Sequence, residues 1–432
     1  MSSLRCLTFV FLFSAIAGCK ILITVPKGGS VATQSETISC DAEQECSVDV
    51  VDVFFDETFQ AIPAEGHVFV HWRKRHRGFC GGSKEVCRLF TSGFEGNDSL
   101  EQILASEEVF YLEPVFIAPD SWERKTAMPQ RLMGLGACAL NGRVYAVGGF
   151  DWRFRATEET PGMANVEAYD PVVDAWQMVA SMNLGRKWLG ATASDERCYA
   201  VGGQTDRGSP GERSLEEYNP ETNAWRSRSE MPAGRLGHAA VALSGKLYVM
   251  GGTSSEDAAA ARTLFVYDIE KDSWSRKADM PRARSFLAAS VVDGKIYVFG
   301  GVETTRGLPT ADVLRYDPAS NSWSVLEDMP TRRAEHSASA VNGKIYVMGS
   351  RDRELCVRAE SCEDLAALAS VDEFDPETGT WASRARMLGG RTAHASVTVG
   401  GRIYAVGGTR SGAYGRTGNT ANEEYTPPLD AD

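Results

Sequence analysis

The chain has 432 residues, and 58 acidic side chains against 45 lysines and arginines leave it with a formal net charge of −13 at pH 7. This negative charge is spread along the chain, which favours a soluble protein and excludes nucleic acid as an expected partner. Apart from the extreme N-terminus, no apolar run reaches the roughly 20 residues that a membrane-spanning helix needs.

The first segment, residues 1–18, is typical of an export signal, with Arg5 before an apolar stretch at 7–17. The sequence IAGC at 16–19 resembles the lipobox of bacterial lipoproteins, which implies that Cys19 is acylated. The alternative is an ordinary signal peptide with a chance cysteine. Two or three acyl chains anchor a protein stably. The resemblance therefore implies a lipid-anchored protein of the bacterial cell envelope, and Lys20 is compatible with the outer membrane.

A small β domain is predicted over residues 19–117, because four segments alternate or run apolar like strands. These segments are 21–25, 48–55, 67–72 and 109–116. Gly66, Phe69 and Trp72, followed by a cysteine pair, resemble the small immunoglobulin-like β-repeats of bacterial surface proteins. That resemblance implies a β-sandwich-like spacer or adhesion domain. The basic run at 73–77 could dock on anionic lipid or polysaccharide, but a solvated hairpin tip is the interpretation that we favour.

Ten cysteines have to be assigned, and six form pairs six or seven residues apart. Export makes disulfides the expected state of these pairs. They are Cys40 with Cys46, Cys80 with Cys87, and Cys356 with Cys362. A metal site is the alternative, but the spacings are not those of zinc ligands, so we predict no metal and no cofactor. Cys138 and Cys198 lie within predicted strands, and we expect both to be free, buried thiols.

Most of the remaining chain is one repeated unit. Six times, a methionine is followed 20 positions later by the first residue of a Gly-Gly pair or a close copy. The pairs are Met128 and Gly148, Met182 and Gly202, Met231 and Gly251, Met280 and Gly300, Met329 and Gly349, and Met387 and Gly407. A tyrosine stands three positions before each glycine, and a tryptophan closes five of the units. A period near 50 residues indicates a repeat architecture.

The third unit illustrates the local structure. Residues 237–243 and 246–250 read as strands, Gly251 and Gly252 end the second one, and 264–267 and the surroundings of Trp274 read as two more. Four short strands at a fixed period are typical of a β-propeller blade, which buries its faces against neighbouring blades.

The Gly-Gly pair, the tyrosine and the tryptophan, in this order, resemble the kelch repeat. The departures are Ser350 for a second glycine, Glu196 at a turn glycine, and a missing tryptophan in the last unit. Trp122 precedes Met128 as Trp176 precedes Met182, so we predict that the Trp122 segment supplies the outer strand of the last blade. The predicted fold is all-β: a six-bladed kelch-type propeller over 118–428, preceded by the small β domain and followed by a tail at 429–432.

An arginine opens each unit, close to the expected start of the first strand. These residues are Arg131, Arg186, Arg235, Arg284, Arg333 and Arg391. The blade topology places them on one face with the loops between second and third strands, of which the first contains Trp152 and Arg153. A ring of guanidinium groups would bind an anionic ligand, such as an acidic sugar or peptide. The alternative, left open here, is that these arginines hydrogen-bond loop carbonyls of the propeller.

Kelch-type propellers include binding domains, sialic-acid mutarotases of the bacterial envelope and copper radical oxidases. The propeller's three histidines, His238, His336 and His394, each lie three residues after an arginine, which indicates a packing role rather than metal binding. A mutarotase would need an acid and a base, for which Glu335 beside His336 is the candidate. We favour a non-enzymatic, monomeric protein that binds a protein partner or an anionic glycan.

Overall fold

The computed structural model describes residues 19–50, 54–83, 86–151, 161–206, 208–256, 258–350, 367–410 and 419–428. The chain divides into two compact units, one up to Pro119 and one from Asp120 onward. In both units the described regular elements are mostly β-strands. Among the described residues, no helix has the length and apolar character needed to cross a membrane.

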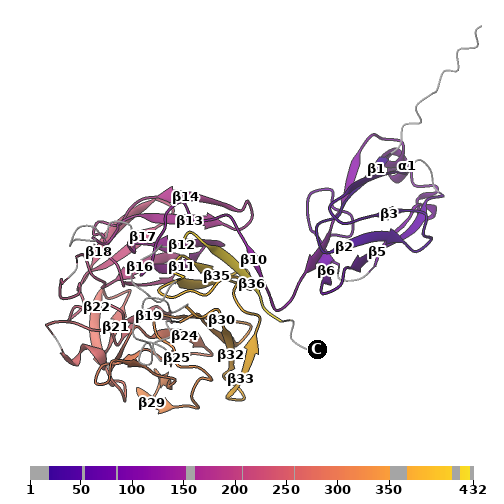
Figure 1. Ribbon diagram of the computed structural model, residues 1–432. Helices are drawn as coiled ribbons and strands as arrows, with labels where there is room; N and C mark the ends of the chain where they lie inside the picture. Colours follow the sequence, from indigo (N-terminus) through magenta and orange to yellow (C-terminus); the bar gives the residue numbers. More distant parts are fainter. Residues whose placement is uncertain are drawn as a thin grey trace, which may run out of the picture. The chain divides into compact units, whose positions relative to one another are not determined.

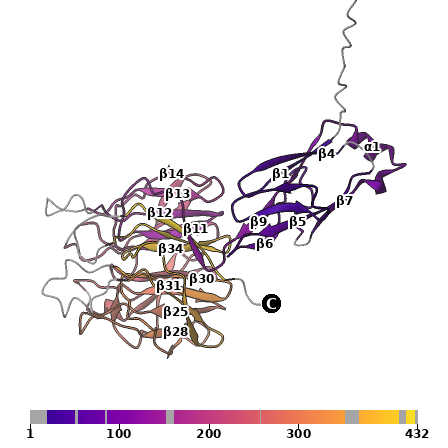
Figure 2. The same cartoon turned by 45° about the vertical axis from the view of Figure 1, so that its right-hand side comes forward.

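The small unit contains nine strands and one short α-helix in the part that is described (Figure 2). The elements are β1 Cys19–Thr24, β2 Gly29–Thr33, β3 Ser39–Cys40, β4 Glu45–Val50, β5 Asp56–Pro63, β6 Val68–Trp72, β7 Cys87–Phe90, the 3-10 helix η1 Thr91–Phe94, α1 Asp98–Leu104, β8 Val109–Leu112 and β9 Pro114–Ile117. They form sheets of order β4-β1-β8, β3-β2-β5-β7 and β6-β9. All four segments expected to be strands contain strands.

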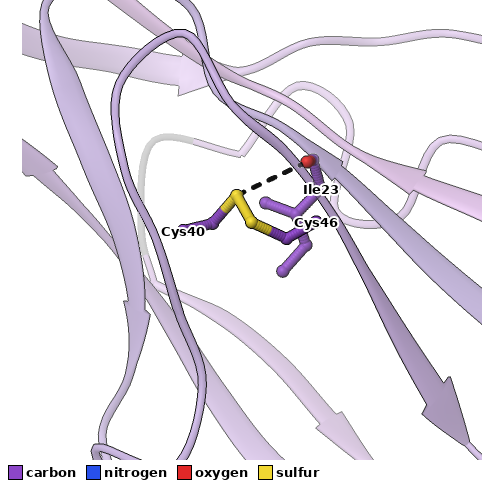
Figure 3. The surroundings of a disulfide bond; sticks show 3 residues. All are labelled: Ile23, Cys40 and Cys46. Atoms are coloured by element: carbon purple, nitrogen blue, oxygen red, sulfur yellow. Dashed lines mark hydrogen bonds between the residues drawn. A yellow bond between two sulfur atoms is a disulfide. The ribbon is translucent and has the colours of Figure 1, made fainter.

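The core of the small unit is apolar and is held by two disulfides. Trp72 is fully buried, and its ring packs edge-on against Phe69 at 5.3 Å between centroids. Cys40 of β3 is bonded to Cys46 of β4, so this disulfide links two of the sheets; Figure 3 shows it beside Ile23. Cys80 is bonded to Cys87. Two of the three predicted local disulfides are therefore present, and the third, Cys356 with Cys362, lies outside the described residues.

The three arginines of the basic run at 73–77 pair with acidic neighbours. Arg73 and Arg75 both approach Glu113, at 2.9 and 3.6 Å, and Arg77 lies 3.0 Å from Glu108. These arginines remain about half exposed, so the ion pairs contribute little stability. This arrangement agrees with a solvated surface rather than an unbalanced cationic patch.

The large unit contains six four-stranded antiparallel sheets within its described residues, which we call blades one to six in chain order (Figure 1). Blade one consists of β11 Gly136–Leu140, β12 Arg143–Val147, β13 Val166–Asp170 and β14 Ala175–Val179. Blade two consists of β15 Gly190–Ser194, β16 Arg197–Val201, β17 Leu215–Asn219 and β18 Ala224–Arg228. Blade three consists of β19 Ala239–Leu243, β20 Lys246–Met250, β21 Leu264–Asp268 and β22 Ser273–Lys277. Blade four is β24 Ala288–Val292, β25 Lys295–Phe299, β28 Val313–Asp317 and β29 Ser322–Val325; blade five is β30 Ser337–Val341, β31 Lys344–Met348, β32 Val371–Asp375 and β33 Thr380–Arg384; blade six is β34 Ala395–Val399, β35 Arg402–Val406, β36 Asn422–Thr426 and β10 Ser121–Arg124. A minor sheet of β23 Arg284–Ser285, β26 Val302–Glu303 and β27 Leu308–Pro309, and the 3-10 helix η3 Ala258–Ala261, lie in the connections.

The first strands of the blades surround a common centre, as Figure 1 shows. Each contacts the first strand of the next blade: β11 with β15, β15 with β19, β19 with β24, β24 with β30, β30 with β34, and β34 with β11. Small side chains on these strands, such as Gly136, Gly190 and Ala239, permit the close approach. A Cβ at Gly136, for example, would lie 2.7 Å from that of Ala191 in blade two.

The Trp122 strand completes blade six, as the sequence predicts. β10 pairs antiparallel with β36, and Trp122 lies opposite Tyr425. Asp120 accepts hydrogen bonds from the Tyr425 hydroxyl at 2.6 Å and from the Ala385 backbone N–H at 2.9 Å. Residues some 300 positions apart thus share one sheet, which leaves β36 no unpaired edge.

The same arrangement recurs at the outer edge of most blades, and we call it the outer clamp. An Asp or Asn two residues before the tryptophan accepts two hydrogen bonds. One comes from a tyrosine hydroxyl of the same blade, and the other from a backbone N–H at the end of the preceding blade. The clamp residues are Asp120, Asp174, Asn223, Asp272 and Asn321. In blade five, Phe374 stands in place of the tyrosine and Gly379 in place of the Asp or Asn. Because both side chains are replaced together, neither a tyrosine hydroxyl nor a carboxylate is left without its partner.

A third disulfide corrects the expectation for the two cysteines of the repeats. Cys138 on β11 is bonded to Cys198 on β16, with 6.1 Å between their Cα atoms. The prediction that both are free is wrong, because the closely packed inner strands bring blade one against blade two at this point. The bond therefore cross-links two blades.

Candidate functional site

Five of the six arginines expected to form a ring are buried. Arg186, Arg235, Arg284, Arg333 and Arg391 have at most 1% of their surface exposed. Four donate from Nη1 to the carbonyl of the first glycine of their own repeat's pair, at 2.6 to 3.1 Å, and Arg391 donates to Ala405 instead.

Each of these guanidinium groups also has a second partner. Arg186 pairs with Glu216 at 2.9 Å, Arg284 with Asp312 at 2.9 Å, Arg333 with Asp372 at 2.6 Å, and Arg391 with Glu423. Arg235 donates to the Thr263 hydroxyl at 2.8 Å and lies 4.7 Å from the centroid of the Phe265 ring. Buried and paired in this way, the five arginines do not form an exposed cationic rim, which corrects that expectation. Their role is to tie the loop of each blade to its first strand.

Blade one breaks this pattern. Leu132 stands at the arginine position, and Arg131 beside it is exposed. Glu167 occupies the place in β13 that Glu216 has in β17, but within the described ranges no arginine forms an ion pair with it. Neither of its carboxylate oxygens has a hydrogen bond of ordinary geometry. Burial raises the pKa of Glu167 to about 7, and the backbone of Gln130 offsets this only in part.

Several predicted site residues lie outside the described part of the chain. These are Trp152, Arg153, Cys356 and Cys362. Cys19 is described: it opens β1, is 4% exposed and directs its thiol toward the Val50 carbonyl at 3.6 Å. Burial raises the pKa of this thiol.

A closed ring of backbone hydrogen bonds lies next to the arginines, two positions further along each unit. We call its six residues the mouth ring: Gly134, Trp188, Gly237, Phe286, Glu335 and Ala393. Each N–H donates to the carbonyl of the equivalent residue in the preceding blade at 2.6 to 3.0 Å, and Gly134 donates to Ala393 to complete the circle. All six have φ between +54° and +61°. A left-handed conformation costs a non-glycine residue about 1–2 kcal/mol, so the ring holds its backbone against a local preference.

The mouth ring repeats its backbone but varies its side chains. Trp188 and Phe286 are half-buried, and they meet edge to face above Gly237 with 5.1 Å between ring centroids. Phe150 packs on the other side of Trp188 at 5.8 Å. The next member, Glu335, is a carboxylate. Together with the layer below, these residues line a cavity of about 120 Å³.

The layer below consists of the next residue of each unit: Leu135, Leu189, His238, Leu287, His336 and His394. Three histidines thus occupy positions that leucine fills elsewhere. The His238 and His336 rings pack against Gly202 and Gly300 of the preceding blades, as Leu287 packs against Gly251. Burial lowers the pKa of His238 and His336 to about 3, so both are neutral. The expected packing role is confirmed.

Glu335 and His336 do not form an acid–base pair. Glu335 accepts a hydrogen bond from the Thr392 hydroxyl at 3.2 Å, whereas neither ring nitrogen of His336 has a hydrogen bond of ordinary geometry. His394 is bonded through Nε2 to the Ser337 hydroxyl at 2.8 Å. In the described ranges, no three His, Cys, Asp or Glu side chains come together as metal ligands.

Sequence reasoning missed the mouth ring. Trp188 and Phe286 were hidden because they differ from their equivalents, and a search for repeated residues passes over such positions. The signal that could have found them is the position itself, two residues after each arginine and one before a leucine or histidine.

Comparisons with known proteins bear on the large unit. The KLHDC2/KLHL20/DRC7 Kelch-repeats domain matches residues 189–413, and the Kelch motif matches residues 131–183. Kelch-like protein 15 of Danio rerio is 32% identical over 121 residues, which are 28% of this chain and 18% of that protein. Alpha-scruin of Limulus polyphemus is 29% identical over 108 residues, 25% of this chain and 11% of that protein. This chain thus spans less than a fifth of the length of these relatives.

Among solved structures, "Structure of YjhT" is similar to this chain. It has a TM-score of 0.56 and 18% identity, and the match covers 69% of this chain and 95% of that one. At this identity the likeness concerns the fold alone.

Proposed function

The chain belongs to the kelch-repeat family, and we propose that it is a non-enzymatic binding protein that holds a protein partner at the mouth ring. The observation that carries this proposal is the ring itself, in which one hydrogen-bonded backbone presents different side chains. Function in repeat proteins lies at positions that vary on a constant scaffold.

The side chains of the ring suit recognition of a protein surface. Trp188 and Phe286 combine a large apolar area with a fixed orientation, and such aromatic residues dominate the binding energy of many interfaces. The closed backbone ring keeps them in place before binding, so little conformational freedom is lost on association. Glu335 adds a polar contact beside them.

We also infer that the six described sheets are the whole propeller. The cyclic contacts of the first strands and the six-membered mouth ring both support this number. A rigid closed disc would hold the aromatic residues in constant geometry whatever the loops around them do.

We propose further that the protein is exported and anchored in a bacterial envelope by acylated Cys19, with an immunoglobulin-like small unit as spacer. The support is the sequence at 1–19 together with two disulfides in the small unit. Acylation would require the Cys19 side chain to leave the protein interior. A Cys19→Ala chain should move from the membrane fraction to the soluble one; retention in the membrane would contradict the anchor.

The binding proposal is tested with peptide and glycan arrays probed by the purified full chain. We expect peptides to be bound, and the double variant Trp188→Ala with Phe286→Ala to lose that signal while its unfolding midpoint changes little. An Arg131→Ala chain serves as the control, because Arg131 is exposed and outside the ring. Undiminished peptide binding by the double variant would contradict the assignment of the site.

A further inference from the structure

The outer strands of the blades differ in charge. Each is the edge of its sheet, and an edge strand exposes backbone N–H and C=O groups that can pair with another chain unless charge discourages it. Most described outer strands carry such charges: Glu123 and Arg124 on β10, Arg226 and Arg228 on β18, Arg276 and Lys277 on β22, and Arg384 on β33. β29 is followed two residues later by Glu327.

β14 of blade one is the exception. Its sequence is AWQMV, and no charged residue occurs between Asp174 and Arg186. The turn before it is also apolar, because Val172 and Val173 stand where blade two has Glu221 and Thr222. β14 thus lacks both the charges of the four charged outer strands and the flanking charge that follows the uncharged strand β29.

The apolar side chains at this edge are exposed to an unusual degree. Val172 is 91% exposed, Val173 67% and Met178 51%. A groove of about 730 Å³ lies beside them, between β14 and the turn of blade two at Pro220. Exposed apolar surface next to a groove marks an interaction site.

The charge of the molecule limits where two copies can associate. At a net charge of −13, two copies repel each other, and the charged outer strands would add like charges where two identical edges meet. At β14 no like charges meet, so the two strands do not repel each other at this edge.

The sequence of β14 is also complementary to itself. If two copies pair antiparallel about Gln177, Gln177 lies opposite Gln177, Trp176 opposite Met178, and Ala175 opposite Val179. Apolar side chains then face apolar ones, and the two amides can hydrogen-bond each other. A two-fold axis through this point makes the interface closed and isologous.

We propose that two copies of this chain associate by antiparallel pairing of β14 about Gln177, extending blade one into a continuous eight-stranded sheet. A five-residue strand with its apolar turn buries an area at the low end for protein interfaces. We expect the dimer to form at micromolar concentrations, and it leaves the mouth ring unaltered, so it is independent of the binding proposal.

The first test is a cross-link at the two-fold axis. In the full chain, Gln177→Cys places two thiols opposite each other, and we expect a disulfide-linked dimer on a non-reducing gel. Arg226→Cys is the matched control, because Arg226 is exposed and holds the same place in β18. Equal cross-linking of the two variants, or no cross-linking of the Gln177→Cys chain, would overturn the proposal. Cross-linking of the Gln177→Cys chain only to a different protein would overturn it as well.

The second test measures the association of the unmodified chain by sedimentation velocity. Gln177→Lys puts two ammonium groups opposite each other and should weaken the dimer at least tenfold, whereas Arg226→Lys should leave it unchanged. Circular dichroism checks that both variants fold. A wild-type chain that stays monomeric at 100 μM, or a Gln177→Lys chain that dimerises as well as wild type, would contradict the proposal.

Discussion

The outer clamps and the mouth ring belong to the same repeats, yet they use sequence in opposite ways. At the outer clamp the side chains recur, with Asp or Asn bonded to Tyr in five blades. At the mouth ring the backbone recurs in all six blades, while the side chains run from glycine to tryptophan. The recurring side chains of the outer clamps hold the blades together. In the mouth ring the backbone hydrogen bonds do this, so the side chains there can differ and can contact a partner.

The buried arginines belong with the clamps in this comparison. They recur in five blades, and each has carboxylate, hydroxyl or carbonyl partners inside the protein. A residue that recurs and is fully paired is part of the framework. The variants below test this division, in order of decreasing effect on stability.

Replacing a framework arginine should cost the most stability. Arg333→Ala removes the partner of Asp372, which lies 2.6 Å away and is itself buried. We expect a loss of about 3–5 kcal/mol in the free energy of unfolding, because an uncompensated charge remains. Urea denaturation measures it. Arg131→Ala, at an exposed position, should change stability by less than about 0.5 kcal/mol. If both variants lost equally little unfolding free energy, the buried arginines would not be part of the framework.

The disulfide between blades one and two should come next. Replacing both Cys138 and Cys198 by Ser removes a bond that closes a loop of 60 residues. We expect a loss of about 2–4 kcal/mol, seen as a lower thermal midpoint under oxidising conditions. Added reductant should lower the wild-type midpoint more than that of the variant, which keeps the two disulfides of the small unit but has lost the bond between the blades. A reductant effect of equal size in both would show that this bond is not the one responsible.

The contribution of Glu167 to stability should depend on pH, because blade one lacks the arginine that pairs with the equivalent Glu216 in blade two. Its folded pKa of about 7 lies above the ordinary value of 4.5, so the unfolded chain releases this proton first as pH rises. Stability is therefore lost between about pH 4.5 and pH 7. Glu167→Gln should be more stable than wild type by about 2 kcal/mol at pH 8 and nearly equal at pH 4. Urea denaturation of both chains at pH 4 and pH 8 measures this. If the two chains differed in stability by the same amount at both pH values, the raised pKa of Glu167 would be contradicted.

The smallest effect should come from the turn of blade two. Glu196 has φ of +58°, where the equivalent Gly245 has +69°. Glu196→Gly should raise the unfolding free energy by about 1 kcal/mol, because glycine adopts this region without strain. The reverse change, Gly245→Glu, is the control and should lower it by a similar amount. A Glu196→Gly chain that is less stable than wild type would show that the side chain contributes contacts of its own.

Spacing in the sequence was enough to predict the blades and the place of Trp122. The tryptophan, the tyrosine and the Gly-Gly pair occur at fixed intervals because each blade needs the same contacts, and Trp122 keeps its interval to Met128 although it precedes the first unit. These features depend on local spacing, which the sequence displays directly.

Features that depend on contacts between blades could not be predicted in this way. Cys138 and Cys198 meet because β11 packs on β16, and their separation of 60 residues gives no sign of it. The direction of the arginine side chains was also open, since an arginine at a strand start can face solvent or a carbonyl. Trp188 and Phe286 gave no repeated signal at all.

If the division holds, the arginines maintain the framework while the mouth ring carries recognition. The decisive experiment follows both unfolding and affinity for one bound peptide in two variants, Arg284→Ala and the double variant Trp188→Ala with Phe286→Ala. We predict that the folded Arg284→Ala chain loses stability by about 3–5 kcal/mol but binds as wild type does, whereas the double variant keeps its stability and binds at least tenfold more weakly. Unaltered stability with lost affinity in Arg284→Ala would contradict the division.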